Sequence, residues 1–460
     1  MESEEASTRE IFASKLGFIL MSAGCAIGLG NIWRFPYITG QYGGGFFVLL
    51  YLIFLVLLGF PILLLELAIG RGGRSTMPGA YKKLKSPESR FPWEKPSYVL
   101  FAGNLILLMF YTAVSGWLLY YGVITAKGSF ANIPKKEIPR IFGDLLADPT
   151  TQILYMGLML LLTVIICMGG IKKTVEKAMK WMMGGLFLLL IILVIKAVTL
   201  PNAWEGVKFF LKPDWQNFAM KNFGAVLHGA LSQAFFTLSI GIGSITVCGS
   251  YMQKEQSIAK EGLWIVVLDT LMAIFSGILI FSCCASFAVD QAAGPSLIFV
   301  TLPHVFRDMA FGRFWGTIFF IFLSIAALST LVAVFENLVS FLIDQFSWKR
   351  KNANLLMGAM VFLFSLPCIF GFNLWKNIQP FGKNSTILDL EDFVLSNNLL
   401  PLGALYLTIF CTSRYGWGLK NTLTELGIKK ELPYLAALYV KWGIPLIILI
   451  VYITGLIKFF

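Results

Sequence analysis

Two apolar stretches of the sequence each contain a Gly-x-Gly pair among small polar side chains. Gly28 and Gly30 form the first pair, and Gly241 and Gly243, which follow Ser239, form the second. Because glycine within a helix costs about 1 kcal/mol relative to alanine, each pair predicts a helix break. A break leaves carbonyl groups free at one helix end and N–H groups free at the other, where a cation and an anion can bind. Close helix packing is the alternative interpretation of these glycines.

The predicted breaks lie in membrane-spanning helices, because the chain is far more apolar than a soluble protein. Hydrophobic residues make up 57% of the sequence and charged residues only 13%, whereas soluble domains carry about 25% charged residues. Many apolar runs are long enough to cross the ~30 Å hydrocarbon core of a bilayer. We therefore predict an all-α integral membrane protein, embedded in a lipid bilayer, with a single domain over residues 1–460.

Eleven transmembrane helices are predicted. They cover residues 12–38, 42–71, 97–125, 152–170, 181–200, 224–250, 262–288, 314–345, 352–371, 390–414 and 432–457. Residues 291–312 are apolar but interrupted by Pro295 and Pro303, so we expect a re-entrant or capping outer loop there.

The net charge of +12 gathers in alternate connections between the spans. Such sorting is typical of cytoplasmic loops and favours a multi-pass protein of the cell membrane over one that binds nucleic acid. The N-terminus is then cytoplasmic, and an odd number of spans places the C-terminus outside. The basic residues concerned are Arg71, Arg74, Lys82, Lys83, Lys85, Arg90, Lys95, Lys172, Lys173, Lys177, Lys180, Lys349, Arg350 and Lys351.

Other reactive residue types do not form a recognisable catalytic pattern. The two histidines, His228 and His304, lie in unrelated contexts, which argues against an integral-membrane enzyme. The seven cysteines lie within or beside apolar runs, and we interpret them as small core residues rather than as a disulfide framework or a metal site.

The spacing of the two breaks favours transport. They fall in spans one and six, five spans apart, and an odd offset reverses the orientation of the second relative to the first. Interrupted helices in corresponding positions of two halves point to the binding site of a secondary transporter. A channel fits less well, because paired broken helices suit alternating access better than a continuous pore.

The residues around the first break carry a family resemblance. Gly24-Cys-Ala-Ile-Gly-Leu-Gly-Asn31-Ile-Trp-Arg-Phe-Pro36, followed by Gly43-Gly-Gly45, resembles the first-helix signature of the neurotransmitter:sodium symporter family. The similarity continues in order through Glu66-Leu-Ala-Ile-Gly70, Tyr111, Phe236-Thr-Leu-Ser-Ile-Gly241, Tyr251, Ser329-Thr330, Asp344 and Asp389-Leu-Glu-Asp392. It implies a bacterial amino acid transporter of the leucine-transporter-type fold. That fold has two inverted-topology five-helix repeats, here residues 12–200 and 224–414, and an additional helix at 432–457.

The resemblance also implies two sodium sites and no organic cofactor. The first site comprises the Ala26 carbonyl, the side chains of Asn31, Thr237 and Asp269, and the carboxylate of the substrate. The second comprises the carbonyls of Gly24, Ile27 and Ala326 and the hydroxyls of Ser329 and Thr330. All of these are oxygen donors, which a small hard cation prefers. Helical hydroxyls more often bond their own backbone, so the assignment of the last two rests on the family match.

Asp269 stands where some relatives carry asparagine, and animal members need chloride near this site. A carboxylate at the centre of a membrane helix costs roughly 2.5–3.5 kcal/mol, so it should be paired, and sodium would supply the partner. We expect its fixed charge to replace chloride, although Tyr51 and Gln233 match other positions of the chloride region. An Asp269 that carries a proton or only packs is the alternative.

The substrate is expected to be an amino acid. Monoamine transporters of the family have an aspartate at the position of Gly28, and a glycine there leaves room for a substrate carboxylate, which the N–H groups of Leu29 and Gly30 would hold. The remaining substrate contacts are assigned to Cys25, Ala26, Leu107, Tyr111, Phe236, Thr237, Ser239, Ile242, Thr330 and Val334. The pocket is mostly apolar, which favours a hydrophobic or aromatic side chain.

Two gates follow from the resemblance. Arg34 and Asp392 would form an outer, water-bridged ion pair above an aromatic lid of Phe236 and Tyr111. On the cytoplasmic side, Arg9 would pair with Asp344 beside Tyr251, with Phe12 where the family often has tryptophan. Interfacial snorkelling is the alternative role for any one of these charged side chains.

Glu66 and a pair of neighbouring glycines have alternative interpretations. Glu66 matches a family glutamate that supports the backbone of the first break, and a proton-relay role is the alternative. Gly184 and Gly185 stand near the start of span five, where many relatives have proline; they either weaken the helix so that it unwinds, or allow tight packing.

A proton-coupled transporter of the same architecture is the rival interpretation, with Asp269 as the proton carrier. No lysine or arginine occurs near Ser329 to replace the second sodium, which favours sodium coupling. A transceptor that binds but barely transports also stays open, and the sequence fixes neither the amino acid, the sodium stoichiometry nor the oligomeric state.

Overall fold

The computed structural model describes residues 12–130, 133–215, 223–287, 297–383, 385–428 and 432–456, and every regular element in these ranges is a helix. Nine of the helices described there are long and apolar enough to cross a membrane, and a bent pair at the N-terminal end makes up to ten. These helices match all of the predicted spans except the sixth. The chain therefore has the all-helical, multi-spanning architecture that its composition predicts.

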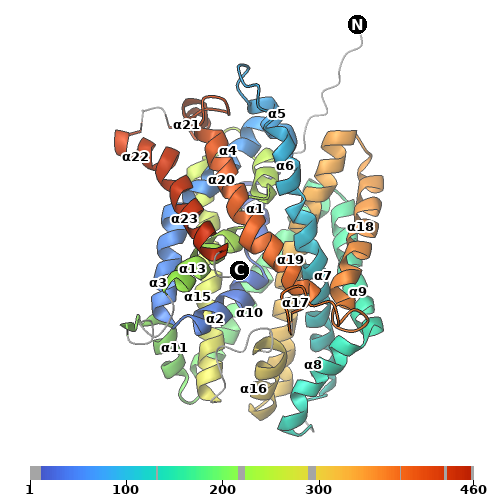
Figure 1. The fold of residues 1–460 in the computed structure, drawn as a ribbon. Helices are drawn as coiled ribbons and strands as arrows, with labels where there is room; N and C mark the ends of the chain where they lie inside the picture. The colour runs from blue at the N-terminus through green and yellow to red at the C-terminus, as the bar shows by residue number, and fades with distance from the viewer. Residues whose placement is uncertain are drawn as a thin grey trace.

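Long helices occur along the whole chain, several of them containing a π-helical turn (Figure 1). The first half of the chain contributes α3 (Gly45–Phe54), the π-helical turn η2 (Leu55–Gly59), α4 (Phe60–Gly73), α6 (Glu94–Phe101), α7 (Gly103–Lys127), α9 (Pro149–Met168), the π-helical turn η4 (Ile171–Val175) and α10 (Glu176–Val198). The second half contributes α15 (Ile258–Ser286), α17 (Gly312–Phe346), α18 (Arg350–Phe370), α19 (Ile387–Asp392), the π-helical turn η6 (Phe393–Leu399), α20 (Leu400–Thr412), α22 (Tyr434–Leu438), the π-helical turn η7 (Tyr439–Gly443) and α23 (Ile444–Leu456).

The first predicted break is present where the glycines place it. Helix α1 (Lys15–Ala26) ends as Ile27 adopts an extended backbone (φ −76°, ψ 107°), and the helix resumes with the π-helical turn η1 (Gly30–Arg34) and α2 (Phe35–Gln41). The two halves meet at an angle of 51°. The prediction of a break between Ile27 and Gly30 is confirmed.

The second predicted break divides the sixth span into α13 (Phe223–Leu238) and α14 (Ser244–Ser250), neither long enough to cross a membrane alone. Three residues between them have left-handed backbones: Ser239 with φ 51°, Gly241 with φ 97° and Gly243 with φ 83°. Glycine adopts this conformation without steric cost, whereas serine does not. The predicted break from Ser239 to Gly243 is therefore confirmed in position.

The fifth span begins about ten residues earlier than its predicted start at residue 181, because the lysine-rich stretch after Ile171 is helical rather than a loop. Gly184 and Gly185 consequently lie inside α10. A Cβ atom at either position would meet no atom within 4 Å, so tight packing does not explain these two glycines.

Short helices gather at the two ends of the bundle (Figure 1). At one end lie α5 (Met77–Leu84) and α21 (Leu419–Glu425), and at the other lie α8 (Ile138–Ala147), α11 (Ala203–Leu211) and α16 (Leu302–Asp308). Helix α16 and the π-helical turn η5 (Leu297–Thr301) fall in the predicted outer loop at 291–312, of which residues 291–296 lie outside the described ranges. Connections predicted to lie on opposite sides of the membrane are thus at opposite ends of the molecule.

Candidate functional site

The two breaks face each other across a small buried cavity of about 20 Å³. Its walls come from α1, the break that follows it, η1, α7, α13, the segment between α13 and α14, and α17, with two contributions from η6 and α20. The lining residues are Cys25, Ala26, Gly28, Gly30, Leu107, Tyr111, Phe236, Ser239, Ile242, Thr330, Leu395 and Leu400. Nine of the twelve predicted substrate contacts are in this set.

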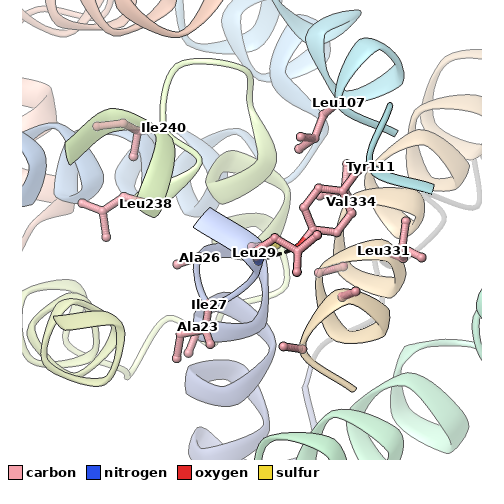
Figure 2. Packing of buried hydrophobic residues seen from close by; sticks show 14 of the residues in the cluster. Ala23, Ala26, Ile27, Leu29, Leu107, Tyr111, Leu238, Ile240, Leu331 and Val334 are labelled. Atoms are coloured by element: carbon pink, nitrogen blue, oxygen red, sulfur yellow. Dashed lines mark hydrogen bonds between the residues drawn. The ribbon is translucent and has the colours of Figure 1, made fainter. Parts of the chain in front are cut away.

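The other three predicted contacts lie beside the cavity. Leu29 lines a larger adjacent cavity, Thr237 is directed to Asp269, and Val334 is fully buried on α17 next to Tyr111 in Figure 2. Leu395 and Leu400, which the sequence did not single out, are two of several leucines in the predicted tenth span. Residue type alone does not distinguish them from an exposed leucine of the same span such as Leu390.

Gly28 is required by close approach rather than by its backbone angles. A Cβ atom there would lie 2.4 Å from the Thr330 hydroxyl and 2.4 Å from the Tyr111 hydroxyl. The absence of a side chain allows both hydroxyl groups to reach the broken segment of the first span. The neighbouring N–H of Leu29 donates to the Tyr111 hydroxyl at 2.9 Å, the bond drawn in Figure 2.

Asn31, Thr237 and Asp269 form a fully buried polar cluster beside the cavity. The Asn31 amide donates to Asp269 Oδ1 at 2.7 Å and to Thr237 Oγ1 at 2.9 Å, and the Thr237 hydroxyl lies 3.0 Å from both carboxylate oxygens of Asp269. The Asn31 carbonyl oxygen accepts from the Gly28 N–H at 3.2 Å. Carboxylate and hydroxyl oxygens therefore lie together beside the Asn31 amide, on three different helices, and such oxygens suit a hard cation.

Thr330 joins α17 to the end of α1. Its hydroxyl oxygen lies 3.2 Å from the carbonyl oxygen of Gly24, 3.1 Å from that of Ile27 and 3.5 Å from that of Ala326. The neighbouring Ser329 hydroxyl donates to the same Ala326 carbonyl at 2.8 Å. The structure thus brings together all five oxygens of the second predicted sodium set.

The first break is also tied to the second. The Ser239 hydroxyl donates to the carbonyl of Cys25 at 2.9 Å. Its left-handed backbone directs the side chain of Ser239 across the cavity to the last turn of α1.

Glu66 supports the second break rather than the first, so this part of the sequence interpretation was wrong. The carboxylate accepts from the Gly241 N–H at 2.8 Å and from the Thr246 N–H at 3.3 Å. Helix α4 packs along α14, and the N–H groups at the start of α14 have no intrahelical acceptors, so a carboxylate on α4 is placed to satisfy them.

A larger cavity of about 400 Å³ lies next to the site and shares Gly30, Tyr111 and Phe236 with it. Arg34 lines this cavity and donates to Gln233 at 2.9 Å and to Ser232 at 3.3 Å. Its guanidinium carbon lies 4.6 Å from the centroid of the Phe236 ring, so the cation covers the aromatic lid.

Asp392 lines the same cavity and accepts from the Ser396 hydroxyl at 2.6 Å. Arg34 and Asp392 form no direct ion pair in the described part of the chain, although they share the cavity wall. The predicted water-bridged arrangement therefore remains a prediction.

On the opposite side of the site, Phe12 closes against the end of α14. Its ring meets that of Tyr251 edge-on at 5.9 Å, and its N–H donates to the Tyr251 carbonyl at 3.3 Å. Asp344 accepts from the Ser75 hydroxyl at 3.1 Å and from the Thr76 N–H at 2.7 Å. Arg9, the predicted partner of Asp344, lies outside the described residues.

Sequence reasoning missed a buried ion pair next to the contact between Phe12 and Tyr251. Glu336, fully buried on α17, receives two hydrogen bonds from Arg350 at 2.8 and 2.9 Å and one from Ser340 at 3.2 Å. Ser340 in turn contacts the Tyr251 hydroxyl. The sequence did contain a signal for this ion pair, because a glutamate inside an apolar span is a charge that needs a partner.

Comparison with known proteins gives this geometry a family. A profile of the sodium:neurotransmitter symporter family matches residues 9–133 and 142–459. The chain belongs to the sodium:neurotransmitter symporter family. An uncharacterised sodium-dependent transporter of Haemophilus influenzae is 35% identical over 97% of the chain and 98% of its own length. The Bacillus subtilis sodium-dependent transporter YhdH is 35% identical over 87% of the chain and 86% of its own length.

A solved structure extends the similarity to three dimensions. The crystal structure of MhsT in complex with L-phenylalanine superposes with a TM-score of 0.88 at 35% identity, covering 97% of this chain and all of that one. This symporter is accordingly a multi-pass, sodium-dependent membrane transporter of the leucine-transporter-type fold. Its relatives are transporters and not enzymes, as the sequence predicted.

Proposed function

We propose that the protein takes up an amino acid, hydrophobic or aromatic in side chain, together with sodium and without a requirement for chloride. Transport proceeds by alternating access to the cavity between the two broken helices. The observation that carries the proposal is the convergence of Gly28, two sets of oxygen donors and an apolar cavity at a single point of the fold.

The carboxylate of the substrate binds at the first break. The N–H groups of Leu29 and Gly30 lie at the start of the outer half-helix, where the helix dipole favours an anion. The Leu29 N–H now donates to the Tyr111 hydroxyl at 2.9 Å, so this bond must open for the carboxylate to bind, and the hydroxyl then turns its own proton towards the same carboxylate. A monoamine lacks this anion, and Gly28 supplies no carboxylate to replace it.

The side chain of the substrate points into the apolar part of the cavity. Leu107, Ile242, Leu395 and Leu400 surround this part, and burial of a substrate side chain there is favourable by about 25 cal/mol per Å² of apolar surface. The similarity to a protein whose structure contains L-phenylalanine supports an aromatic or large aliphatic substrate. The cavity of about 20 Å³ holds little more than one water molecule, so Phe236 and its neighbours must move apart to admit such a substrate.

Two sodium ions travel with the substrate. The first is held by Asn31, Thr237, Asp269, the Ala26 carbonyl and the substrate carboxylate. For this, the Asn31 amide must rotate so that its oxygen, now bonded to the Gly28 N–H, faces the ion. The second is held by the five oxygens around Thr330, with the hydroxyl proton turned away. Each charge that moves inward gains about 2.3 kcal/mol per 100 mV, so two ions provide roughly 4.6 kcal/mol before any concentration gradient.

Asp269 makes the protein independent of chloride. It places a fixed negative charge next to the first ion, and it is fully buried with Asn31 and Thr237 as its hydrogen-bond donors. A chloride ion in the same region would be repelled by this carboxylate and would no longer be needed for charge balance.

The architecture comprises eleven transmembrane helices in two inverted five-helix repeats, residues 12–200 and 224–414, followed by a helix at 432–457. The sixth span is then the α13–α14 pair read as one interrupted helix. The N-terminus is cytoplasmic and the C-terminus outside, in the cell membrane. The separation of α5 and α21 from α8, α11 and α16 in Figure 1 supports this assignment of sides.

Alternating access is controlled at both ends of the site. Arg34 and Asp392 close the outer cavity through intervening water above Phe236 and Tyr111, and Arg9, Asp344 and Tyr251 close the inner path with Phe12. The outer cavity of about 400 Å³ is the route by which substrate reaches the lid.

The proposal is tested with purified protein in liposomes. Counterflow of a radiolabelled amino acid panel is measured with sodium, lithium or choline outside, each with chloride or gluconate. We expect sodium-dependent accumulation of one or more apolar amino acids that persists in gluconate. Uptake that ignores sodium would overturn the coupling, and uptake lost in gluconate would overturn chloride independence.

A further inference from the structure

Two cysteines on different helices touch next to the candidate site. Sγ of Cys25 and Sγ of Cys248 are 3.7 Å apart, and each residue is only 1% exposed. They are 223 positions apart in the sequence, so no local pattern joins them. Core packing explains the burial of each cysteine, and the contact between the two sulfur atoms adds the possibility of a disulfide.

The two cysteines lie on the two broken spans, one on each. Cys25 belongs to the last turn of α1 and lines the cavity, and its carbonyl accepts the Ser239 hydroxyl at 2.9 Å. Cys248 lies on α14, beyond the second break. A covalent bond between the two sulfur atoms would therefore connect the inner half of the first broken span to that of the sixth.

A small oxidant can reach the pair although bulky reagents cannot. The cavity beside Cys25 is about 20 Å³, enough for a molecule close to water in size, and hydrogen peroxide is only slightly larger. It adjoins the outer cavity of about 400 Å³ through Gly30, Tyr111 and Phe236. A reagent of amino acid size would need the lid to open first.

We propose that Cys25 and Cys248 are an oxidation site at which hydrogen peroxide forms a disulfide that arrests transport. The Cys25 sulfur attacks one peroxide oxygen, the O–O bond breaks, and the thiol proton leaves with the other oxygen as water. The Cys248 sulfur then attacks the resulting sulfenic acid, the S–S bond forms, and the second water leaves with the Cys248 proton. Two thiols lose two electrons in total, and one peroxide is reduced to two waters.

The geometry explains why the disulfide stops transport. An S–S bond is about 2.05 Å long, so the sulfur atoms must approach by roughly 1.6 Å from their separation of 3.7 Å. The last turn of α1 also carries the Gly24 carbonyl, and the Ile27 carbonyl follows it; both lie 3.1–3.2 Å from the Thr330 hydroxyl. A shift of this size in the turn disrupts the oxygen set around Thr330, and the covalent link fixes the disruption. This step rests on the proposed sodium coupling, whereas formation of the disulfide does not.

The test measures the bond and its consequence separately. Protein in liposomes is treated with hydrogen peroxide, unreacted thiols are alkylated after denaturation, and peptides are mapped by mass spectrometry with and without dithiothreitol. We expect a linked peptide pair that contains Cys25 and Cys248, together with a loss of sodium-dependent uptake of about tenfold or more, as expected when a required conformational step is blocked. Dithiothreitol should restore both.

Two variants serve as controls. Cys248→Ala removes one partner, and its uptake should resist peroxide; Cys368→Ala removes an equally buried cysteine on α18 and should leave the peroxide sensitivity unchanged. Absence of the linked peptide in the wild-type protein overturns the proposal, as does a linked protein that transports at the unoxidised rate. If the reduced protein shows no sodium-dependent uptake at all, the proposed function fails, while the peptide map still decides whether the disulfide forms.

Discussion

Substitution of Gly28 by alanine is the most direct test of the site geometry. The added Cβ atom would lie 2.4 Å from the hydroxyl oxygens of both Tyr111 and Thr330, well inside van der Waals contact. The Tyr111 hydroxyl accepts a hydrogen bond from the Leu29 N–H, and the Thr330 hydroxyl lies among the oxygens of the second proposed sodium site. One methyl group therefore disturbs the substrate site and an ion site together.

The expected size of the effect follows from packing. Inserting a methyl group into a close-packed site costs about 1–3 kcal/mol, which corresponds to about 5- to 150-fold in affinity. We expect Gly28→Ala to raise the half-saturating concentrations of amino acid and of sodium by factors in this range. Binding of a radiolabelled amino acid to purified protein at several sodium concentrations measures both quantities.

The chain provides a matched control for the same substitution. Gly184→Ala adds a methyl group inside α10 where no atom lies within 4 Å, so it should leave both half-saturating concentrations unchanged. In the double variant Gly28→Ala/Tyr111→Phe, one of the two clashing hydroxyls is absent, and the double-mutant cycle should show positive coupling. Unchanged sodium and substrate binding in Gly28→Ala would refute the proposed role of this close approach.

Three further substitutions test separate parts of the site. Asp269→Asn should lower the affinity for sodium or make uptake depend on chloride. Uptake measured in chloride and in gluconate distinguishes these two outcomes. Equal uptake by the variant and the wild type in both anions would contradict the role of the carboxylate. Thr330→Val keeps the side-chain shape but removes the hydroxyl bonded to the carbonyls around it, at a cost of about 1–3 kcal/mol. It should raise the half-saturating sodium concentration about tenfold. An unchanged value would argue against the second ion site. Glu66→Gln leaves one of the N–H groups of Gly241 and Thr246 without an acceptor and should lower the melting temperature by about 1–3 °C. An unaltered melting temperature would count against this support of the second break.

Much of the site could be predicted from the sequence, because its signals are local. Gly28 and Gly30 sit among apolar neighbours within one helical turn, and the cost of glycine in a helix needs no knowledge of the partner helices. The same reasoning placed the second break between Ser239 and Gly243, where three left-handed backbones occur in five residues. Local physics thus fixed where the helices break.

The remaining features depend on contacts that no local pattern encodes. Glu66 meets Gly241 across 175 positions of sequence, and which of the two breaks it supports is decided by how α4 packs on α14. Leu395 and Leu400 became cavity residues through the π-helical turn η6, which rotates the helix faces relative to an ideal α-helix. The bend of the sixth span made it two helices too short to cross a membrane, although its composition reads as one span.

The left-handed backbone of Ser239 has a consequence for engineering this protein. Among L-residues this conformation costs roughly 1–2 kcal/mol, and glycine would adopt it without that cost. A screen for heat-resistant variants should therefore be drawn to glycine at this position. The gain would come at the expense of the hydroxyl that joins the two breaks through the Cys25 carbonyl. Selection for stability alone would then yield a more heat-stable protein in which no hydrogen bond from residue 239 joins the two broken helices. This is an example of the trade-off between stability and activity at a strained residue.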